Sequence, residues 1–129
     1  RRQRQMCIRD RGTVMEYGDR AHVFLSGTAS INNKGEVVHV GNIVKQTERM
    51  WENVGVLLEE GGASFDDVMQ IIVYLRDVCD YPTVKEMFAR RFPDTPKVIT
   101  LAPVCRPTWL IEMECIAVKK RCNEKYRDF

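Results

Sequence analysis

The stretch that decides the fold is residues 102–118, APVCRPTWLIEMECIAV, because its second half alternates between two sets of side chains as a β-strand does. One set is Ile111, Met113, Cys115 and Ala117, and the other is Leu110, Glu112, Glu114 and Ile116. Two residues along a strand span roughly 6.6 Å, so the two carboxylates share a face and influence each other. Desolvation there would raise a carboxyl pKa toward the range of a general acid. The stretch therefore predicts both a strand and a candidate site.

Two other segments follow helical spacing instead of alternation. Apolar residues recur at that spacing over residues 43–60, after Asn42 as a suitable N-cap and before a Gly-Gly pair that ends the run. A second helix is predicted to begin at Asp80, with Pro82 near its first position, and to end before Pro93. The sequence therefore predicts two amphipathic helices.

The strands that we predict are residues 13–17, 22–29, 36–40, 69–75, 97–103 and 110–118. Gly27 lies inside the second of them, at a point where another group can approach the backbone closely. Two helices can cover only one face of one sheet. We therefore predict a two-layer α+β domain, with one mixed sheet and both helices on the same face.

The uncovered face of such a sheet would be apolar. The residues expected on it are Phe24, Ile72, Tyr74, Leu110, Ile116 and Val118. An apolar area of this size is unusual on the surface of a monomer, so it predicts self-association. Glu112, Glu114 and Arg76 would then lie in or beside a subunit interface.

Length and charge exclude several classes of protein. The chain of 129 residues is expected to form one domain, and no apolar run approaches the length of a membrane span. The net charge of +2 comprises +4 in residues 1–11 and +3 in residues 119–129, so the body carries −5. An acidic body argues against a nucleic-acid groove. We expect residues 1–11 to be a basic extension, for which a non-native origin is one interpretation, and residues 120–129 to be a solvated basic tail.

The cysteines indicate a reducing environment. Five of them occur without a C-x-x-C pair, and an odd number suits free thiols in a cytoplasmic protein. Two histidines without the usual ligand spacing do not form a zinc site. We therefore expect no metal and no cofactor.

Residues 12–119 resemble the Rid family, the YjgF-like reactive-intermediate deaminases. The resemblance is carried by FLSGTAS at 24–30, NIVKQTERMWENVGVLLEEGGASFDDV at 42–68, IIVYLRDVCDYPTVKEMFARRF at 71–92 and LIEMECIAV at 110–118. It implies a homotrimer with small-molecule sites in the clefts between subunits. Two positions depart from the deaminases: Val98 stands where they have a carboxylate-binding arginine, and no tyrosine stands near Arg11 and Gly12.

A closer resemblance is to the C-terminal part of chorismatases, through RGTVMEYGDRAHVFLSGTASI at 11–31, IVYLRD at 72–77 and APVCRPTWLIEMECIA at 102–117. It implies that Glu112 is the acid and that Cys105 marks the branch forming 3-hydroxybenzoate. Chorismatases carry a further N-terminal portion, so we expect the chain to match only part of such an enzyme. The residues expected to bind substrate are Arg76, Arg106, Gly27, Thr28, Tyr74 and Glu114.

The first functional hypothesis is release of pyruvate from chorismate, in which Glu112 protonates the enolpyruvyl methylene carbon and Arg76 and Arg106 bind the two carboxylates. An enamine or imine deaminase, a non-catalytic trimeric module and, with least support, a ribonuclease are the alternatives. For single residues, Cys105 could be inert, and Glu112 could be a structural partner of an arginine.

Overall fold

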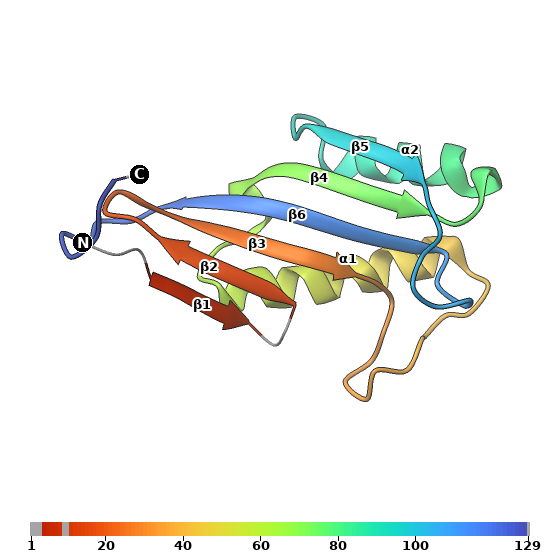
Figure 1. Cartoon of the computed structure of the whole chain (residues 1–129). Coiled ribbons are helices and arrows are strands. Elements are labelled where there is room, and N and C mark those ends of the chain that lie inside the picture. Colours follow the sequence, from red (N-terminus) through yellow and green to blue (C-terminus); the bar gives the residue numbers. More distant parts are fainter. Residues whose placement is uncertain (1–3, 9–10, 129) are drawn as a thin grey trace.

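Two helices pack on one face of a six-stranded sheet in the computed structural model, which describes residues 4–8 and 11–128 (Figure 1). The strands are β1 (Arg4–Ile8), β2 (Gly12–Glu16), β3 (Arg20–Thr28), β4 (Val68–Leu75), β5 (Lys97–Leu101) and β6 (Ile111–Lys120). The helices are α1 (Ile43–Glu60) and α2 (Tyr81–Arg91). Short 3₁₀ turns at Phe65–Asp67 and Val78–Asp80 precede β4 and α2. The predicted two-layer α+β fold is confirmed.

The last strand of the chain lies in the middle of the sheet. The strand order is β1-β2-β3-β6-β4-β5, and β6 pairs antiparallel with both β3 and β4. β4 and β5 are parallel, because α2 connects them across the sheet face. Residues from both halves of the chain therefore meet on β6.

The two faces of β6 differ as the alternation predicts. Ile111, Met113, Cys115 and Ala117 are buried, whereas Glu112, Glu114, Ile116 and Val118 are only half-buried. The buried side of the sheet packs against α1 and α2, where Trp51, Phe88 and Phe92 contact one another edge to face or tilted. The carboxylates are therefore excluded from the main core and lie on the face that no helix covers.

Both predicted helices are confirmed. α1 spans residues 43–60 as expected, and the side chain of Asn42 caps it by accepting a hydrogen bond of 3.0 Å from the Lys45 amide. α2 has Pro82 in its first turn. No helix within the described residues is long and apolar enough to cross a membrane.

The expected strand at residues 36–40 is wrong. This region holds only an isolated bridge between Ile31 and Val37, because Gly35, His39 and Gly41 all have positive φ angles that interrupt an extended backbone. Residues 29–42 form a long loop instead, which connects β3 to α1.

The two ends of the chain are more structured than we expected. β1 pairs with β2 along its whole length, within the region that we expected to be an extension outside the domain. The C-terminal tail lies on the β2–β3 hairpin, where Gly18 donates to the Arg127 carbonyl and Asn123 donates to the Gly18 carbonyl. Backbone hydrogen bonds of this kind hold the tail against the sheet.

One buried polar side chain connects α1 to the loops at the end of the sheet. Gln46 is fully buried, and its amide nitrogen donates to the carbonyls of His39 and Thr108 at 3.2 and 3.1 Å. Its amide oxygen accepts a hydrogen bond of 3.0 Å from the Leu110 backbone. Gln46 therefore fixes the point at which β6 begins relative to α1.

Replacing Gln46 by leucine should lower the free energy of unfolding by roughly 2–4 kcal/mol, because it removes three hydrogen bonds to the backbone of His39, Thr108 and Leu110. Urea denaturation measures the change. Glu48→Leu at an exposed position of α1 is the control, and we expect a change within about 0.5 kcal/mol. Equal stability of the two variants would show that water replaces the amide.

Candidate functional site

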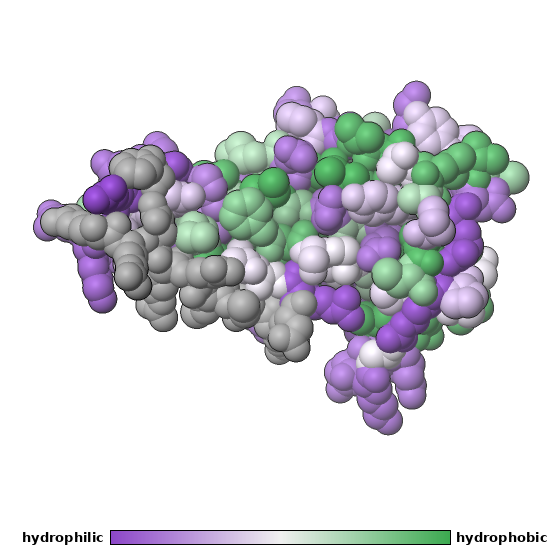
Figure 2. Space-filling view, viewed as in Figure 1, coloured by the Kyte–Doolittle hydropathy of each residue, from purple (hydrophilic) through white to green (hydrophobic). Residues whose placement is uncertain are grey.

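The carboxylates of β6 lie in two rows of residues that cross the uncovered face of the sheet. Glu114 is opposite Ile72 of β4, which is opposite Val98 of β5. Glu112 is opposite Tyr74 in the same way. Because residues opposite each other in a sheet share a face, these side chains all point away from the helices. Figure 2 shows this face, with apolar areas interrupted by hydrophilic positions.

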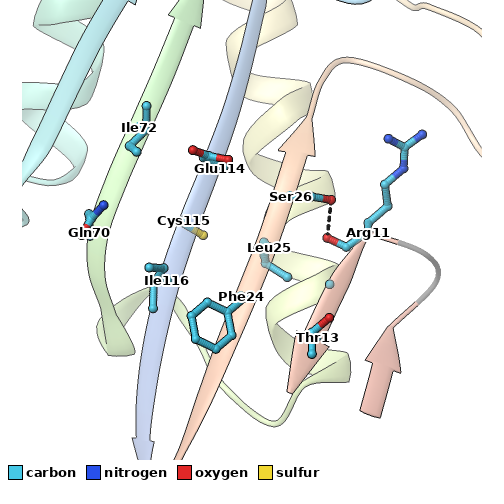
Figure 3. Close-up of a pocket in the computed structure, with 11 residues that line it drawn as sticks. Arg11, Thr13, Phe24, Leu25, Ser26, Gln70, Ile72, Glu114, Cys115 and Ile116 are labelled. Carbon is cyan, nitrogen blue, oxygen red and sulfur yellow. Dashed lines mark hydrogen bonds between the residues drawn. The ribbon is translucent and has the colours of Figure 1, made fainter. Parts of the chain in front are cut away.

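A hollow of about 600 Å³, which we call the sheet pocket, opens on this face (Figure 3). Apart from Arg11, which precedes β2, its residues come from β2, β3, β4 and β6, which the topology brings side by side. Thr13, Phe24, Ile116 and Gln70 form one row across it by strand register. The lining is apolar at Phe24, Ile72 and Ile116 and charged at Glu114 and Arg11.

Gly27 and Glu112 meet at an irregularity in β3. The register between β3 and β6 shifts between Leu25 and Thr28, where β3 contains one residue more than β6. A Cβ atom on Gly27 would lie 1.9 Å from Oε1 of Glu112, so any larger residue would displace this carboxylate. The close approach predicted at Gly27 is confirmed, and the group that approaches is the candidate acid.

The surroundings of Glu112 favour its protonated form. Desolvation raises the pKa of the Glu112 carboxyl above its usual range; the charge of Arg11 opposes this rise, and the charge of Glu114 adds to it. A carboxyl group with a raised pKa keeps its proton closer to neutral pH, as a general acid must.

Tyr74 and Glu114 form a hydrogen-bonded pair beside it. The Tyr74 hydroxyl donates to Oε1 of Glu114 at 2.7 Å. This bond is the main cause that raises the pKa of Tyr74, with further contributions from desolvation and from the charges of Glu114 and Glu112. Glu114 is therefore held by a donor, whereas no hydrogen bond is formed by the Glu112 carboxylate within the described residues.

The two arginines predicted to bind carboxylates form hydrogen bonds with backbone carbonyls. Arg76 donates to the carbonyls of Trp109, Val104 and Arg106, at 2.8, 3.1 and 2.6 Å, and thereby holds the loop before β6. Arg106 donates to the Gly35 carbonyl and lies over the ring of Trp109. Neither forms an ion pair with a glutamate of β6 within residues 4–8 and 11–128. The structure thus places Gly27, Glu112, Tyr74 and Glu114 next to one another, while the guanidinium groups of Arg76 and Arg106 donate to backbone carbonyls.

The cysteines separate into exposed and buried positions. Cys105 is exposed in the loop between β5 and β6, next to Arg106. Cys115 is buried against the helices, and burial raises the pKa of its thiol to about 12, which disfavours the nucleophilic thiolate. In the part of the chain that the structure describes, no three histidine, cysteine or acidic side chains are arranged to hold a metal ion.

Arg11 is the residue at this site that the sequence analysis missed. It precedes β2, and its carbonyl accepts hydrogen bonds of 2.8 Å from both the backbone and the hydroxyl of Ser26. Because Thr13 faces the sheet pocket, the residue two positions earlier points to the same face. The available signal was an arginine inside RGTVME at the start of the family resemblance, but we counted it with the basic extension.

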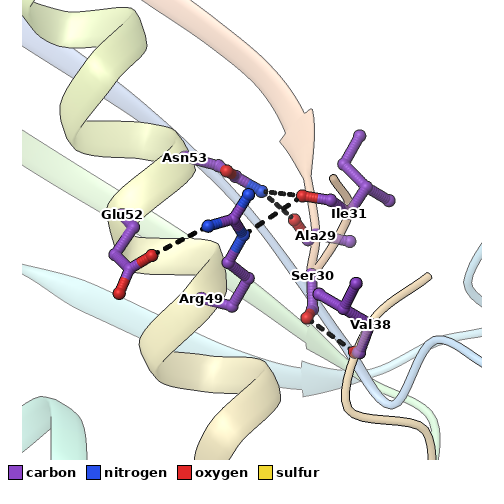
Figure 4. Close-up of polar contacts among 7 residues, drawn as sticks. All are labelled: Ala29, Ser30, Ile31, Val38, Arg49, Glu52 and Asn53. Atoms are coloured by element: carbon purple, nitrogen blue, oxygen red, sulfur yellow. Dashed lines mark hydrogen bonds and ion pairs between the residues drawn. The ribbon is translucent and has the colours of Figure 1, made fainter. Parts of the chain in front are cut away.

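A second hollow of about 440 Å³, which we call the loop pocket, lies where β3 ends against α1. Arg11, Thr28, Asn32, Arg49 and Trp109 are among its residues, so Arg11 lines both pockets. Figure 4 shows how the loop is held: Arg49 pairs with Glu52 at 3.0 Å and donates to the Ile31 carbonyl, and Asn53 donates to the carbonyls of Ala29 and Ile31.

Comparisons with known proteins give matches along most of the chain. The model of the family described as Endoribonuclease L-PSP matches residues 14–119. A RutC family protein of Pyrococcus abyssi is 38% identical over 101 residues, which are 76% of this chain and 79% of that protein. The 3-aminoacrylate deaminase RutC of Acinetobacter baylyi is 31% identical over 97 residues, which are 74% of this chain and 77% of the enzyme.

Among solved structures, a chorismatase superposes on the chain with a TM-score of 0.75 and 24% identity. The superposition covers 83% of this chain but 35% of the chorismatase. At this identity the match shows a common fold and no more.

The hydrogen bond between Tyr74 and Glu114 predicts a spectroscopic result. Replacing Glu114 by glutamine should lower the pKa of Tyr74, because the charged acceptor that favours the phenol is lost. Absorbance titration of tyrosinate measures the change, and Tyr74→Phe identifies which transition belongs to Tyr74. Glu48→Gln on the exposed side of α1 is the control and should leave the titration unchanged. An unchanged transition in Glu114→Gln would contradict the pairing.

Proposed function

The chain belongs to the endoribonuclease L-PSP family, also called Rid or YjgF, and from this premise we propose that it is a small-molecule enzyme that deaminates an enamine of the 3-aminoacrylate type. Glu112 is the acid in this proposal. The observation that carries it is the half-buried Glu112 carboxyl with a raised pKa, placed against Gly27 on the uncovered face of the sheet.

The chemistry requires a proton donor at carbon. The nitrogen of an enamine donates its electron pair into the C=C bond, so the carbon next to the carboxylate is basic. Transfer of the Glu112 proton to this carbon leaves an iminium group at the carbon that carries nitrogen. Water adds there, ammonia leaves, and an aldehyde remains, while a proton from the water returns to Glu112. The net reaction consumes one enamine and one water and yields one aldehyde and one ammonia.

The similarity to the Acinetobacter baylyi deaminase supports this substrate class, since it extends over 74% of the chain. Val98 is the feature that the proposal must accommodate, because its exposed side chain on β5 offers no charge to a substrate carboxylate. A cation for the substrate carboxylate would therefore come from another part of the fold. The family description contains the word endoribonuclease, but the acidic body of this chain does not favour a polyanionic substrate.

Cleavage of chorismate is the second candidate function. It needs the same first step, since protonation of the methylene carbon of an enol ether generates an oxocarbenium ion from which pyruvate can leave. The apolar walls of the sheet pocket at Phe24, Ile72 and Ile116 favour it, because they suit a six-membered ring. In this reaction Cys105 would influence the ring product, in keeping with the resemblance to the branch that forms 3-hydroxybenzoate.

We also propose that the chain assembles as a homotrimer with sites between subunits. The support is the uncovered sheet face, on which Phe24 and Val98 are exposed and Ile72 and Ile116 are half-buried. No helix of the described chain covers this face. Burial of these side chains against other copies would remove apolar area from water.

Light scattering should give three times the chain mass of 15.0 kDa. Phe24→Glu should reduce the assembly to monomers, because it places a charge at the apolar interface. Val44→Glu on α1 is matched in exposure, 40% against 39% for Phe24, and should leave the assembly intact. A monomeric wild-type protein would contradict the proposal, as would a trimeric Phe24→Glu variant.

Replacing Glu112 by glutamine should lower kcat/KM roughly 10²–10⁴-fold with little change in folding, because the amide keeps the shape but cannot donate the proton. Ammonia release from 3-aminoacrylate generated in situ measures the first reaction, and pyruvate release from chorismate measures the second. Glu48→Gln is the control and should be as active as the wild type. Absence of both products from the wild-type protein would favour a binding module over an enzyme.

The pH profile tests the role of the same residue. Because the protonated form is active, kcat/KM should fall as pH rises through the pKa of Glu112, which lies above the usual carboxyl range. The direction is opposite to that expected of a general base, whose activity would rise over the same interval. A profile in which activity increases with pH through this interval would assign Glu112 to base catalysis instead.

A further inference from the structure

We propose that Arg11 is the cation of this site and receives the carboxylate of a small, planar, unsaturated acid whose skeleton lies in the sheet pocket. This inference deepens the proposed function, on which its relevance to turnover rests, by naming the group that holds the substrate. Three features of Arg11 support it: its position, the absence of described hydrogen bonds or ion pairs to its guanidinium, and the charged and apolar side chains around it.

The main chain places Arg11 beside the candidate acid. Its carbonyl accepts from both the backbone amide and the hydroxyl of Ser26, each at 2.8 Å (Figure 3). Ser26 directly precedes Gly27, which contacts Glu112. The side chain of Arg11 extends past Ser26 in the direction in which β3 runs, so it reaches the boundary between the sheet pocket and the loop pocket.

The guanidinium of Arg11 is available for a ligand. It forms no hydrogen bond or ion pair with the residues that the structure describes. The other arginines near the site differ, since Arg49 is paired with Glu52 and Arg76 and Arg106 donate to backbone carbonyls. A planar guanidinium without partners can bind a carboxylate through two parallel hydrogen bonds.

The charges around Glu112 give this placement a mechanistic consequence. The groups that face Glu112 are Arg11 before β2, the Tyr74 hydroxyl on β4 and Glu114 on β6, while β3 presents Gly27. The positive charge of Arg11 favours the ionised form of Glu112, so it holds the pKa of this carboxyl below the value that burial alone would give. A ligand carboxylate bound to Arg11 offsets that charge. Binding therefore promotes protonation of the acid when the substrate is present.

The side chains that line the sheet pocket favour an apolar skeleton for the part of the ligand beyond its carboxylate. Phe24 and Ile116 are opposite each other across β3 and β6, and Ile72 is opposite Glu114 across β4 and β6. Together they form an apolar surface next to two ionisable groups, which suits a flat hydrocarbon skeleton with a charged end. A fully polar ligand would gain little from these walls.

Binding of benzoate, with benzamide as the uncharged analogue, tests the inference by isothermal titration calorimetry on the full chain. We expect the wild-type protein to bind benzoate and to bind benzamide at least roughly tenfold more weakly, since charge-assisted hydrogen bonds are lost. Arg11→Gln should reduce the affinity for benzoate by a similar factor, and Arg11→Lys by less. Arg90→Gln removes the same charge from an exposed position on α2 and should bind as the wild type does.

The side chain of Arg11 makes no described contact that the fold requires, so we expect Arg11→Gln to fold, which thermal unfolding checks. Glu112→Gln separates the inference from the proposed function, because it should lower kcat/KM roughly 10²–10⁴-fold and keep benzoate binding. Loss of benzoate binding in Arg11→Gln supports the inference even if neither candidate substrate is turned over. Unchanged benzoate binding in Arg11→Gln, equal binding of benzamide by the wild type, or no binding of benzoate by the wild type would overturn it.

Discussion

The constraint on which the rest of the structure depends is the central position of β6 between β3 and β4. β6 is paired along both edges, and its two faces meet different environments because the helices cover only one side of the sheet. The side packed on α1 and α2 accepts only apolar residues, and the alternation in IEMECIAV places both glutamates on the other side. A slip of one residue would bury two carboxylates in the core. Folding and the position of the candidate acid are thus fixed by the same register.

Irregular backbone next to this strand gives the site its shape. β3 contains an extra residue between Leu25 and Thr28, and the missing side chain of Gly27 provides room for the Glu112 carboxylate. The hydroxyl of Ser26 then holds the segment before β2. Gln46 and Arg76 fix the loops at the same end through buried or half-buried carbonyls. Hydrogen bonds to backbone carbonyls therefore hold the loops and strands around Glu112, Glu114 and Arg11 in place.

Local patterns in the sequence predicted the parts of the fold that local physics determines. The helix over residues 43–60 has a cap, a periodic apolar stripe and a stop, and each could be identified without the structure. The strand predicted over residues 36–40 was wrong because β propensity takes no account of the positive φ angles of Gly35, His39 and Gly41. Arg11 was missed because its position next to β3 depends on hydrogen bonds from Ser26, fifteen residues away, and not on its neighbours in the sequence. The partners of Arg76 are likewise backbone carbonyls, which carry no sequence signal.

The side of Glu112 on which a ligand's carboxylate is bound determines which atom of the ligand lies closest to the Glu112 proton. A cation at position 98 would lie on β5, separated from Glu114 by Ile72. Arg11 lies on the opposite side of β6, beyond β3. A ligand bound there would extend over Glu112 and Glu114 in the opposite direction. Glu112 lies between positions 11 and 98. The ligand carbon nearest the Glu112 proton therefore depends on which of these positions carries the cation. Under the proposed function, moving the cation from one side of β6 to the other would therefore change both the ligand atom that faces Glu112 and the charge next to that carboxyl.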